Sequence, residues 1–308
     1  MQITTTKSPA PLGVGFTWQA NLPKALGRGW ELVDFLEISP DVLCREKVTD
    51  GQRTLEYHPA LLGEALASAA ERSIVIHGLG LSIGSAHGWS EEYLRILDQF
   101  HQQQSFHWHS EHLSYLLTTT PDGQPLHTGI PLPMPFTEEA LDVLVPRAVA
   151  LNKRYGVPFC LENLTYYLPG LPCDHGWDEI AFLNELTARS GCGLLLDLYN
   201  FYCNAVNFGF DALAALKRLR LESVIEIHLA GGATHDGWLT DIHTREVPEP
   251  VWELLEWVAP RAPNLCGIVY EVMEPAVPLL GAARLTAQLE RVRRIWDSAR
   301  ERRTYAIG

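Results

Sequence analysis

The sequence predicts a (β/α)8 barrel, the TIM barrel, formed by one α/β catalytic domain over residues 1–308. Short β-rich runs alternate with longer amphipathic runs, which is the pattern of a parallel sheet with crossover helices. Eight such units fit the length of the chain. Runs such as Gly193–Asp197 and Ile74–His77 are almost entirely apolar, as strands covered on both faces should be. A doubly wound open sheet is the alternative, but no Gly-rich phosphate loop follows the first expected strand.

The expected elements follow one another in regular order. The strands are Leu12–Phe16, Val33–Ile38, Ser73–His77, Phe106–His112, Pro158–Asn163, Gly193–Leu198, Val224–Leu229 and Gly267–Val272. The helices between and after them are Leu22–Gly29, Pro59–Arg72, Ser90–Gln104, Thr137–Tyr155, Asp178–Ser190, Asp211–Leu219, Pro250–Ala259 and Leu279–Arg302. Thr137, followed by two glutamates, is typical of a capped helix start.

Composition excludes several classes of protein. The net charge is -13, from 37 acidic and 24 basic residues, which argues against binding to nucleic acid or to an anionic membrane. The N-terminus lacks the apolar core of a signal peptide, and no apolar run approaches the roughly 18 residues of a membrane span. The six cysteines are scattered without a C-x-x-C pair, which indicates buried free thiols in a reducing compartment. We therefore expect a cytoplasmic protein.

Histidines and carboxylates gather at the ends of the expected strands and in the loops that follow them. They are His77, Glu111, His112, Glu162, Asn163, Asp197, His228 and Glu271 at strand ends, with Asn200, Asp241 and His243 just beyond. Each alone is typical of a rim histidine, a helix cap or a turn residue. In a barrel, however, strand C-terminal ends build one active-site face. Burying this many unpaired charges there costs several kcal/mol each, so a bound cation is expected to offset that cost.

The ligand types narrow the choice of metal. No cysteine belongs to the set, which argues against structural zinc, and the histidines disfavour magnesium. A mixed His, Asp, Glu and Asn set suits iron, manganese or zinc. The candidates outnumber the positions of one octahedron, so we expect two or three metal ions bridged by carboxylates.

Other features have weaker expectations. His109 shares its strand parity with Glu111, so we expect it to point into the barrel one layer below. Aromatic residues after the fifth and sixth strands line a substrate pocket or pack the rim: Tyr166, Tyr167, Tyr199, Phe201 and Tyr202. The segments Gly78–Trp89 and Leu113–Pro135 are the longest loops, and each is a lid or a docking surface.

The motifs taken together resemble those of a known family. They are His77-Gly-Leu-Gly-Leu-Ser-Ile-Gly-Ser85, Ser110-Glu-His-Leu113, Leu161-Glu-Asn163, Leu194-Leu-Leu-Asp197 with Asn200, Ile227-His-Leu-Ala-Gly231, Asp241-Ile-His243 and Glu271. In this order, from about residue 13 to residue 290, the chain resembles the multinuclear non-heme iron-dependent oxidative enzymes. That group includes the oxidase of methanobactin biosynthesis. The chain departs from the family pattern at Gly232, where a histidine is usual, at Tyr199 and after Glu271.

The resemblance implies a TIM barrel that holds two or three iron ions, as mixed Fe(II) and Fe(III), with dioxygen as co-substrate. Such an oxidoreductase modifies a ribosomally synthesised precursor peptide, often at cysteine, in natural-product biosynthesis. A separate protein commonly recognises the leader of that peptide. The metal ligands carried over by motif are His77, Glu111, His112, Glu162, Asp197, His228, Asp241, His243 and Glu271, with Asn200 as a further candidate. We assign catalysis to His77, Asp241 and His243.

Two other functions fit a barrel with these ligands. A divalent-metal sugar isomerase or a phosphodiesterase-like hydrolase uses a comparable set without oxygen chemistry, although the acidic charge counts against a nuclease. A non-catalytic subunit that binds a partner is the third reading, but a scaffold has no reason to keep so many converging polar groups. The metal content of protein purified without oxygen separates these functions.

Overall fold

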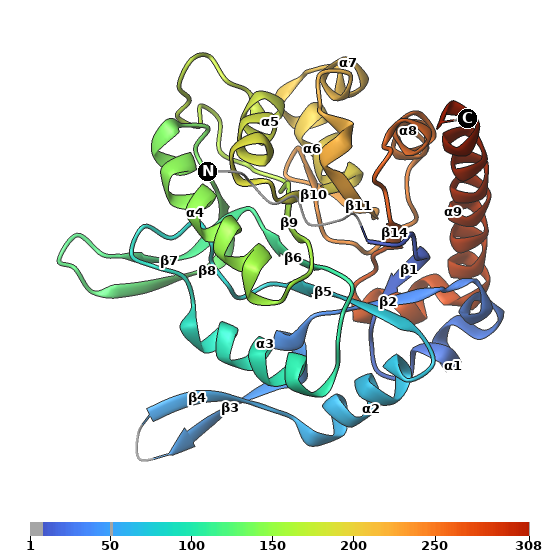
Figure 1. Cartoon of the computed structure of the whole chain (residues 1–308), viewed down its shortest axis with the longest axis horizontal. Coiled ribbons are helices and arrows are strands. Elements are labelled where there is room, and N and C mark those ends of the chain that lie inside the picture. The colour runs from blue at the N-terminus through green and yellow to red at the C-terminus, as the bar shows by residue number, and fades with distance from the viewer. Residues whose placement is uncertain (1–8, 50–51, 308) are drawn as a thin grey trace.

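The computed structural model of the chain describes residues 9–49 and 52–307 and confirms the predicted barrel. Eight parallel strands close on themselves in the order β1-β14-β11-β10-β9-β6-β5-β2, as Figure 1 shows. Their bounds are β1 Gly13–Thr17, β2 Phe35–Ile38, β5 Ser73–Gly78, β6 His109–His112, β9 Phe159–Glu162, β10 Gly193–Asp197, β11 Val224–Leu229 and β14 Gly267–Tyr270. Each observed strand lies inside the range expected from the sequence or extends beyond it by one residue. The periodicity of buried strands was therefore a sufficient guide to the barrel.

Helices surround the barrel at the expected places (Figure 1). They are α1 Leu22–Leu26, α2 Pro59–Ala69, α3 Glu91–Gln103, α4 Glu138–Arg154, α5 Glu179–Ser190, α7 Ala212–Leu216, α8 Glu249–Val258 and α9 Val277–Ile307. Short 3-10 turns join them: η1 Gly27–Leu32, η2 Pro40–Leu43, η3 Leu221–Ser223, η4 Ala259–Arg261 and η5 Glu274–Ala276. None of the helices in the described ranges combines the length and apolarity that a bilayer crossing needs.

One helix was not expected from the sequence. Helix α6, Leu198–Phe208, begins directly after β10, between the expected strand Gly193–Leu198 and the expected helix Asp211–Leu219. Asp197 ends the strand and also caps the helix, because its Oδ1 accepts a hydrogen bond from Asn200 N at 2.7 Å. Gly209, at φ 71°, ends the helix in the left-handed region.

Three antiparallel hairpins extend the described part of the chain beyond the barrel. They are β3 Cys44–Thr49 with β4 Gln52–Tyr57, β7 Ser114–Thr119 with β8 Pro125–Pro133, and β12 Ala233–His235 with β13 Trp238–Thr240. The second lies in the segment that was expected to be a loop. Its first strand is fastened to the segment after β5, since Ser82 Oγ accepts from Leu116 N at 2.7 Å and Gly84 N donates to Ser114 O at 2.9 Å. The two longest expected loops thus form one ordered unit.

The interior of the barrel has an apolar floor. It is built from Phe35, Val75, Trp108, Cys160, Leu195, Ile225, Cys266 and Val269. Trp108 points inward, so alternation along the same strand turns Ser110 and His112 inward as well. His109 and Glu111 consequently point outward, toward the helices. This alternation decides which side chains of β6 can reach the mouth of the barrel.

Candidate metal centre

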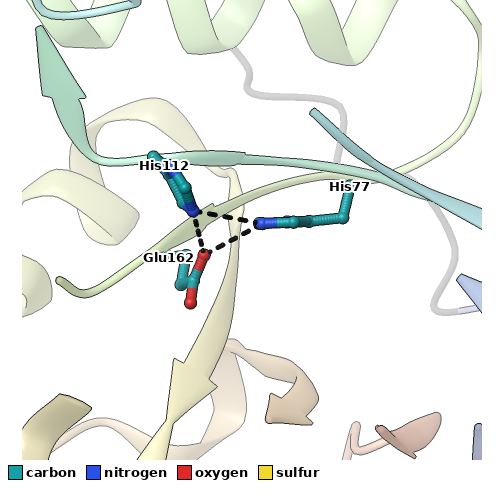
Figure 2. A group of neighbouring side chains, drawn as sticks. All are labelled: His77, His112 and Glu162. Atoms are coloured by element: carbon teal, nitrogen blue, oxygen red, sulfur yellow. Dashed lines mark hydrogen bonds and ion pairs between the residues drawn. The ribbon is translucent and has the colours of Figure 1, made fainter. Parts of the chain in front are cut away.

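Two histidines and a glutamate meet above the apolar floor. His77 of β5, His112 of β6 and Glu162 of β9 come from three neighbouring strands and point toward one another, as Figure 2 shows. Glu162 Oε2 lies 3.2 Å from His77 Nε2 and 3.2 Å from His112 Nε2, and the two nitrogens are 3.3 Å apart. Three potential ligand atoms of the right types therefore face one point.

Ser110 sets the orientation of His77. Its hydroxyl donates to Ile76 O at 3.1 Å, so its oxygen is free to accept from His77 Nδ1, which lies 3.0 Å away. With the proton on Nδ1, the lone pair of Nε2 faces His112 and Glu162. This is the tautomer that a metal ligand requires. The serine belongs to a recognised motif, but its role was not predicted.

Two further groups continue from Glu162 along the mouth. In each group the potential ligand atoms lie within 4.8 Å of one another. One consists of Glu162, Asp197 and His228, and the other of Asp197, His243 and Glu271. Glu162 and Asp197 each belong to two groups, so a row of three sites would share bridging carboxylates. The expectation of carboxylate-bridged ions fits this geometry.

Glu271 connects two of the imidazoles. Its Oε2 lies 3.0 Å from His228 Nδ1 and its Oε1 lies 3.3 Å from His243 Nδ1. Burial acts to raise the pKa of this carboxyl, but the imidazoles of His243 and His228 hold the pKa well below its usual range. Glu271 is therefore an anion in the folded protein.

The side chains of two asparagines fix the carboxylates in place. Asn163 joins β9 to β10, because its Nδ2 donates to Asp197 O and its Oδ1 accepts from Asp197 N, both at 2.9 Å. Asn200 Nδ2 donates to Asn163 O at 3.2 Å and reaches Glu162 Oε1 at 3.4 Å. Asn200 thus contacts a side chain of the candidate metal centre, whereas the side chain of Asn163 binds only the backbone of Asp197.

Two carboxylates beneath His228 were missed by the sequence reading. Glu37 Oε2 lies 2.7 Å from His228 Nε2, and Glu226 Oε2 accepts from Trp108 Nε1 at 2.8 Å. Glu37, Glu226 and His228 are all completely buried. A signal was present, because Glu37 stands near the end of the second apolar strand, as His77 stands near the end of the third. Glu226 stands two residues before His228 and therefore shares its face.

Glu111 does not join the centre, which corrects its assignment from the sequence. It points outward from β6, and its Oε1 lies 2.8 Å from His109 Nε2. His109 packs against the rings of Tyr155 and Phe159 in the outer layer, so it does not point into the barrel as expected. The shared parity of these two residues was inferred correctly, but the face was not. Trp108, which was not considered, fills the inward position below Ser110.

Asp241 lies at the rim of the centre. Its Oδ1 contacts His243 Nε2, and its backbone N donates to Tyr167 Oη at 3.0 Å. The side chain of Asp241 is 22% exposed, while the side chains of Glu162 and Asp197 are almost completely buried. His112 and Glu271, at 20% and 18%, are similarly exposed, whereas His243, at 11%, is more enclosed.

The chemistry of the cluster suits divalent or trivalent cations. Burial raises the pKa of Asp197 well above its usual value, and the nearby carboxylates of Glu162 and Asp241 add to the rise. Within the described residues Asp197 Oδ2 is buried without a hydrogen-bond partner. A cation would satisfy this oxygen and relieve the repulsion between the carboxylates. The residues present therefore fit a metal centre.

Two departures from the family pattern are adjacent in space. A Cβ atom on Gly232 would lie 2.6 Å from Tyr199 Oη and 2.1 Å from Thr240 O. Tyr199 Oη also donates to Thr240 O at 3.2 Å. The backbone carbonyl of Thr240 is the nearest atom, so it alone leaves no room for a side chain at position 232, and the Tyr199 hydroxyl narrows the space further. Gly232 and Tyr199 thus lie together beside the loop that carries Asp241.

Comparisons with known proteins match most of the chain. The family model described as "RiPP precursor modification enzyme MbnB/TglH/ChrH" matches residues 12–297. A UPF0276 protein of Caulobacter vibrioides is 32% identical over 270 residues, which cover 87% of this chain and 88% of that protein. A UPF0276 protein of Rhizorhabdus wittichii is 38% identical over 183 residues, which cover 59% of this chain and 63% of that protein.

Among solved structures, a xylose isomerase domain protein from Alicyclobacillus acidocaldarius is similar in fold. The TM-score is 0.52 at 14% sequence identity, and the match covers 94% of this chain and 99% of that chain. At this identity the likeness concerns the barrel alone.

Proposed function

Because the chain belongs to the MbnB/TglH/ChrH family of RiPP precursor modification enzymes, we propose that it is an iron-dependent enzyme that oxidises a ribosomally synthesised precursor peptide with dioxygen. The observation that carries the proposal is the row of three ligand groups that share Glu162 and Asp197. A row of this kind suits a multinuclear centre with histidine and carboxylate ligands. We further propose that the barrel acts as a single catalytic domain.

The chain's own residues would divide the work as follows. His77, His112 and Glu162 would hold the first ion; Glu162, Asp197 and His228 the second; Asp197, His243 and Glu271 the third, with Asn200 and Asp241 beside them. Bound iron would supply the one-electron chemistry and the activation of dioxygen. Asp241 and His243 can hold a proton between Oδ1 and Nε2. Burial excludes water from Glu162, Asp197 and His228.

Iron content and oxygen dependence test this function directly. Protein purified without oxygen is expected to hold at least two iron ions per chain, with a Mössbauer spectrum of coupled irons. Admission of dioxygen is expected to change the mass of a short cysteine-containing peptide encoded beside the gene. Bound zinc or manganese, with isomerase or hydrolase activity that needs no dioxygen, would support the alternative function instead.

We also propose that a second protein holds the leader of the peptide. The unit formed by residues 78–89 and 113–135 stands at the catalytic end and exposes apolar side chains, with Leu126 46% and Ile130 62% exposed. Ordered loops at this end of a barrel commonly carry recognition.

Removal of the partner is expected to reduce modification of the full-length precursor to background. Ile130→Glu is expected to weaken partner binding while iron content stays unchanged, because Ile130 is remote from the ligands in the barrel. Leu279→Glu in α9, where Leu279 is 79% exposed, is the matched control and should bind the partner normally. Full-rate modification by the barrel alone, or modification of a leaderless peptide, would contradict the proposal.

A further inference from the structure

A second cavity lies outside the metal centre, at the same end of the barrel. Its volume is about 660 Å³, which is within the usual range for sites that take small organic groups. The segment after β9, the first turn of α5, residues Phe201 and Phe208 of α6 and helix α7 surround it, and Figure 1 shows these helices gathered together. The segments that follow β9 and β10 thus form part of the cavity wall, and the proposed metal ligands Glu162 and Asp197 stand at the ends of these two strands.

One buried carboxyl group in this cavity has no cationic partner among the residues that the structure describes. Glu179 is 7% exposed and lines the cavity; its Oε2 accepts a hydrogen bond from Asn204 Nδ2 at 3.3 Å. The neighbouring Asp178 is different, because it caps α5 and pairs with Arg218. Arg218 also lines the cavity, but its charge is matched by that of Asp178. Desolvation raises the pKa of Glu179 to about 8, with a smaller contribution from Asp178, although Asn204 opposes the rise. A carboxylate in this position would be stabilised by a cation brought by a ligand.

The rest of the wall suits such a ligand. Tyr166 and Phe208 stack with their ring centroids 4.9 Å apart, and Trp177 and Phe210 also line the cavity. Aromatic faces attract cations and also cover the hydrocarbon stem that carries them. Asp211 stands exposed at the cavity and adds negative charge. Aromatic rings around a buried carboxylate are a recognition site for an alkylammonium or guanidinium group.

We propose that this cavity binds a lysine or arginine side chain of the precursor peptide. The inference rests on the proposed function and names the chemistry of its substrate. The net charge of -13 would attract a basic peptide. Helix α6 connects the two sites, because Asn200 in its first turn reaches Glu162 and Phe208 in its last turn lines the cavity.

Calorimetry with the full, metal-loaded chain tests the cavity. The probes are acetyl-Gly-Arg-Gly-amide and the same peptide with citrulline, which keeps the shape of arginine and removes its charge. The arginine peptide is expected to bind at least about tenfold more tightly, as a charge-assisted contact to a carboxylate requires. In Glu179→Gln the two peptides should bind equally weakly. Glutamine can still accept the hydrogen bond from Asn204, so the fold around the cavity is preserved.

Glu185→Gln is the matched control, since Glu185 stands on the same helix and its carboxylate pairs with Arg189. This variant should discriminate between the peptides as the unaltered chain does. Equal binding of both peptides to the unaltered chain, or undiminished discrimination in Glu179→Gln, overturns the inference. Free agmatine bound more than about tenfold more tightly than the peptide would assign the cavity to a small amine and overturn it as well. If the inference fails while the iron content is normal, the proposed function still stands. If the chain discriminates between the peptides but binds no iron, the cavity inference stands and the proposed function fails.

Discussion

Replacing Glu162 with glutamine is expected to lower metal affinity by more than about a hundredfold, which exceeds the usual cost of losing an outer-shell partner. The expectation follows from its place in two ligand groups, where one carboxylate faces both His77 and His228. The neutral amide would leave two sites without an anionic bridge. Metal titration of the metal-free protein measures the effect, and modification of the precursor should fall with it.

Glu111→Gln provides the matched control for this experiment. Both glutamates are almost completely buried and stand at the ends of paired strands, but Glu111 faces His109 on the outer side of β6. Its replacement should leave metal content and affinity unchanged. Equal loss of metal in the two variants would contradict both the assignment of Glu162 as a bridge and the exclusion of Glu111.

The barrel could be predicted because its signals are local. Strands buried on both faces are apolar throughout, and the helices that follow have their own period and caps. Helix α6 and hairpin β7–β8 escaped because their signals depend on context. The sequence pattern around Asp197 indicates a strand end and a metal ligand. It does not show that the same side chain also caps α6. The hairpin depends on its attachment to Ser82, more than thirty residues earlier in the chain.

The site was predictable wherever a polar residue closed an apolar strand. The sequence shows that alternate residues of a strand point to the same side. It does not show which of the two sets points into the barrel. Glu111 and His112 are adjacent in β6, and only the inward Trp108 decides which of them reaches the mouth. Glu37 escaped because it stands inside an apolar strand, one residue before its end. Its partner His228 is 191 residues away in the sequence, so no local pattern connects them.

Glu37 is the residue for which we expect the second large effect. Its Oε2 lies 2.7 Å from His228 Nε2, and His228 Nδ1 faces Glu271 at the centre. A carboxylate at this position keeps the proton on Nε2 and leaves Nδ1 free for a metal ion. In Glu37→Gln the amide can donate to Nε2 instead, which would place the proton on Nδ1 and block the ligand atom.

Metal affinity in Glu37→Gln is therefore expected to fall by about 10- to 100-fold, the usual cost of losing such a partner. Burial lowers the pKa of His228, but the Glu37 and Glu271 carboxylates raise it well above its usual value. Nitrogen NMR of the His228 ring in the metal-free chain should therefore show a lower pKa in Glu37→Gln than in the unaltered chain, which a purely structural role would not produce. Glu226→Gln is the control, because Glu226 is equally buried and belongs with Glu37 and His228 to one group of potential ligands, whereas its Oε2 accepts from Trp108 Nε1. A loss of affinity shared equally by both variants would mean that buried charge beneath the centre, and not the orientation of His228, governs metal binding. Retention of full affinity in Glu37→Gln would show that Glu271 alone suffices to orient the imidazole.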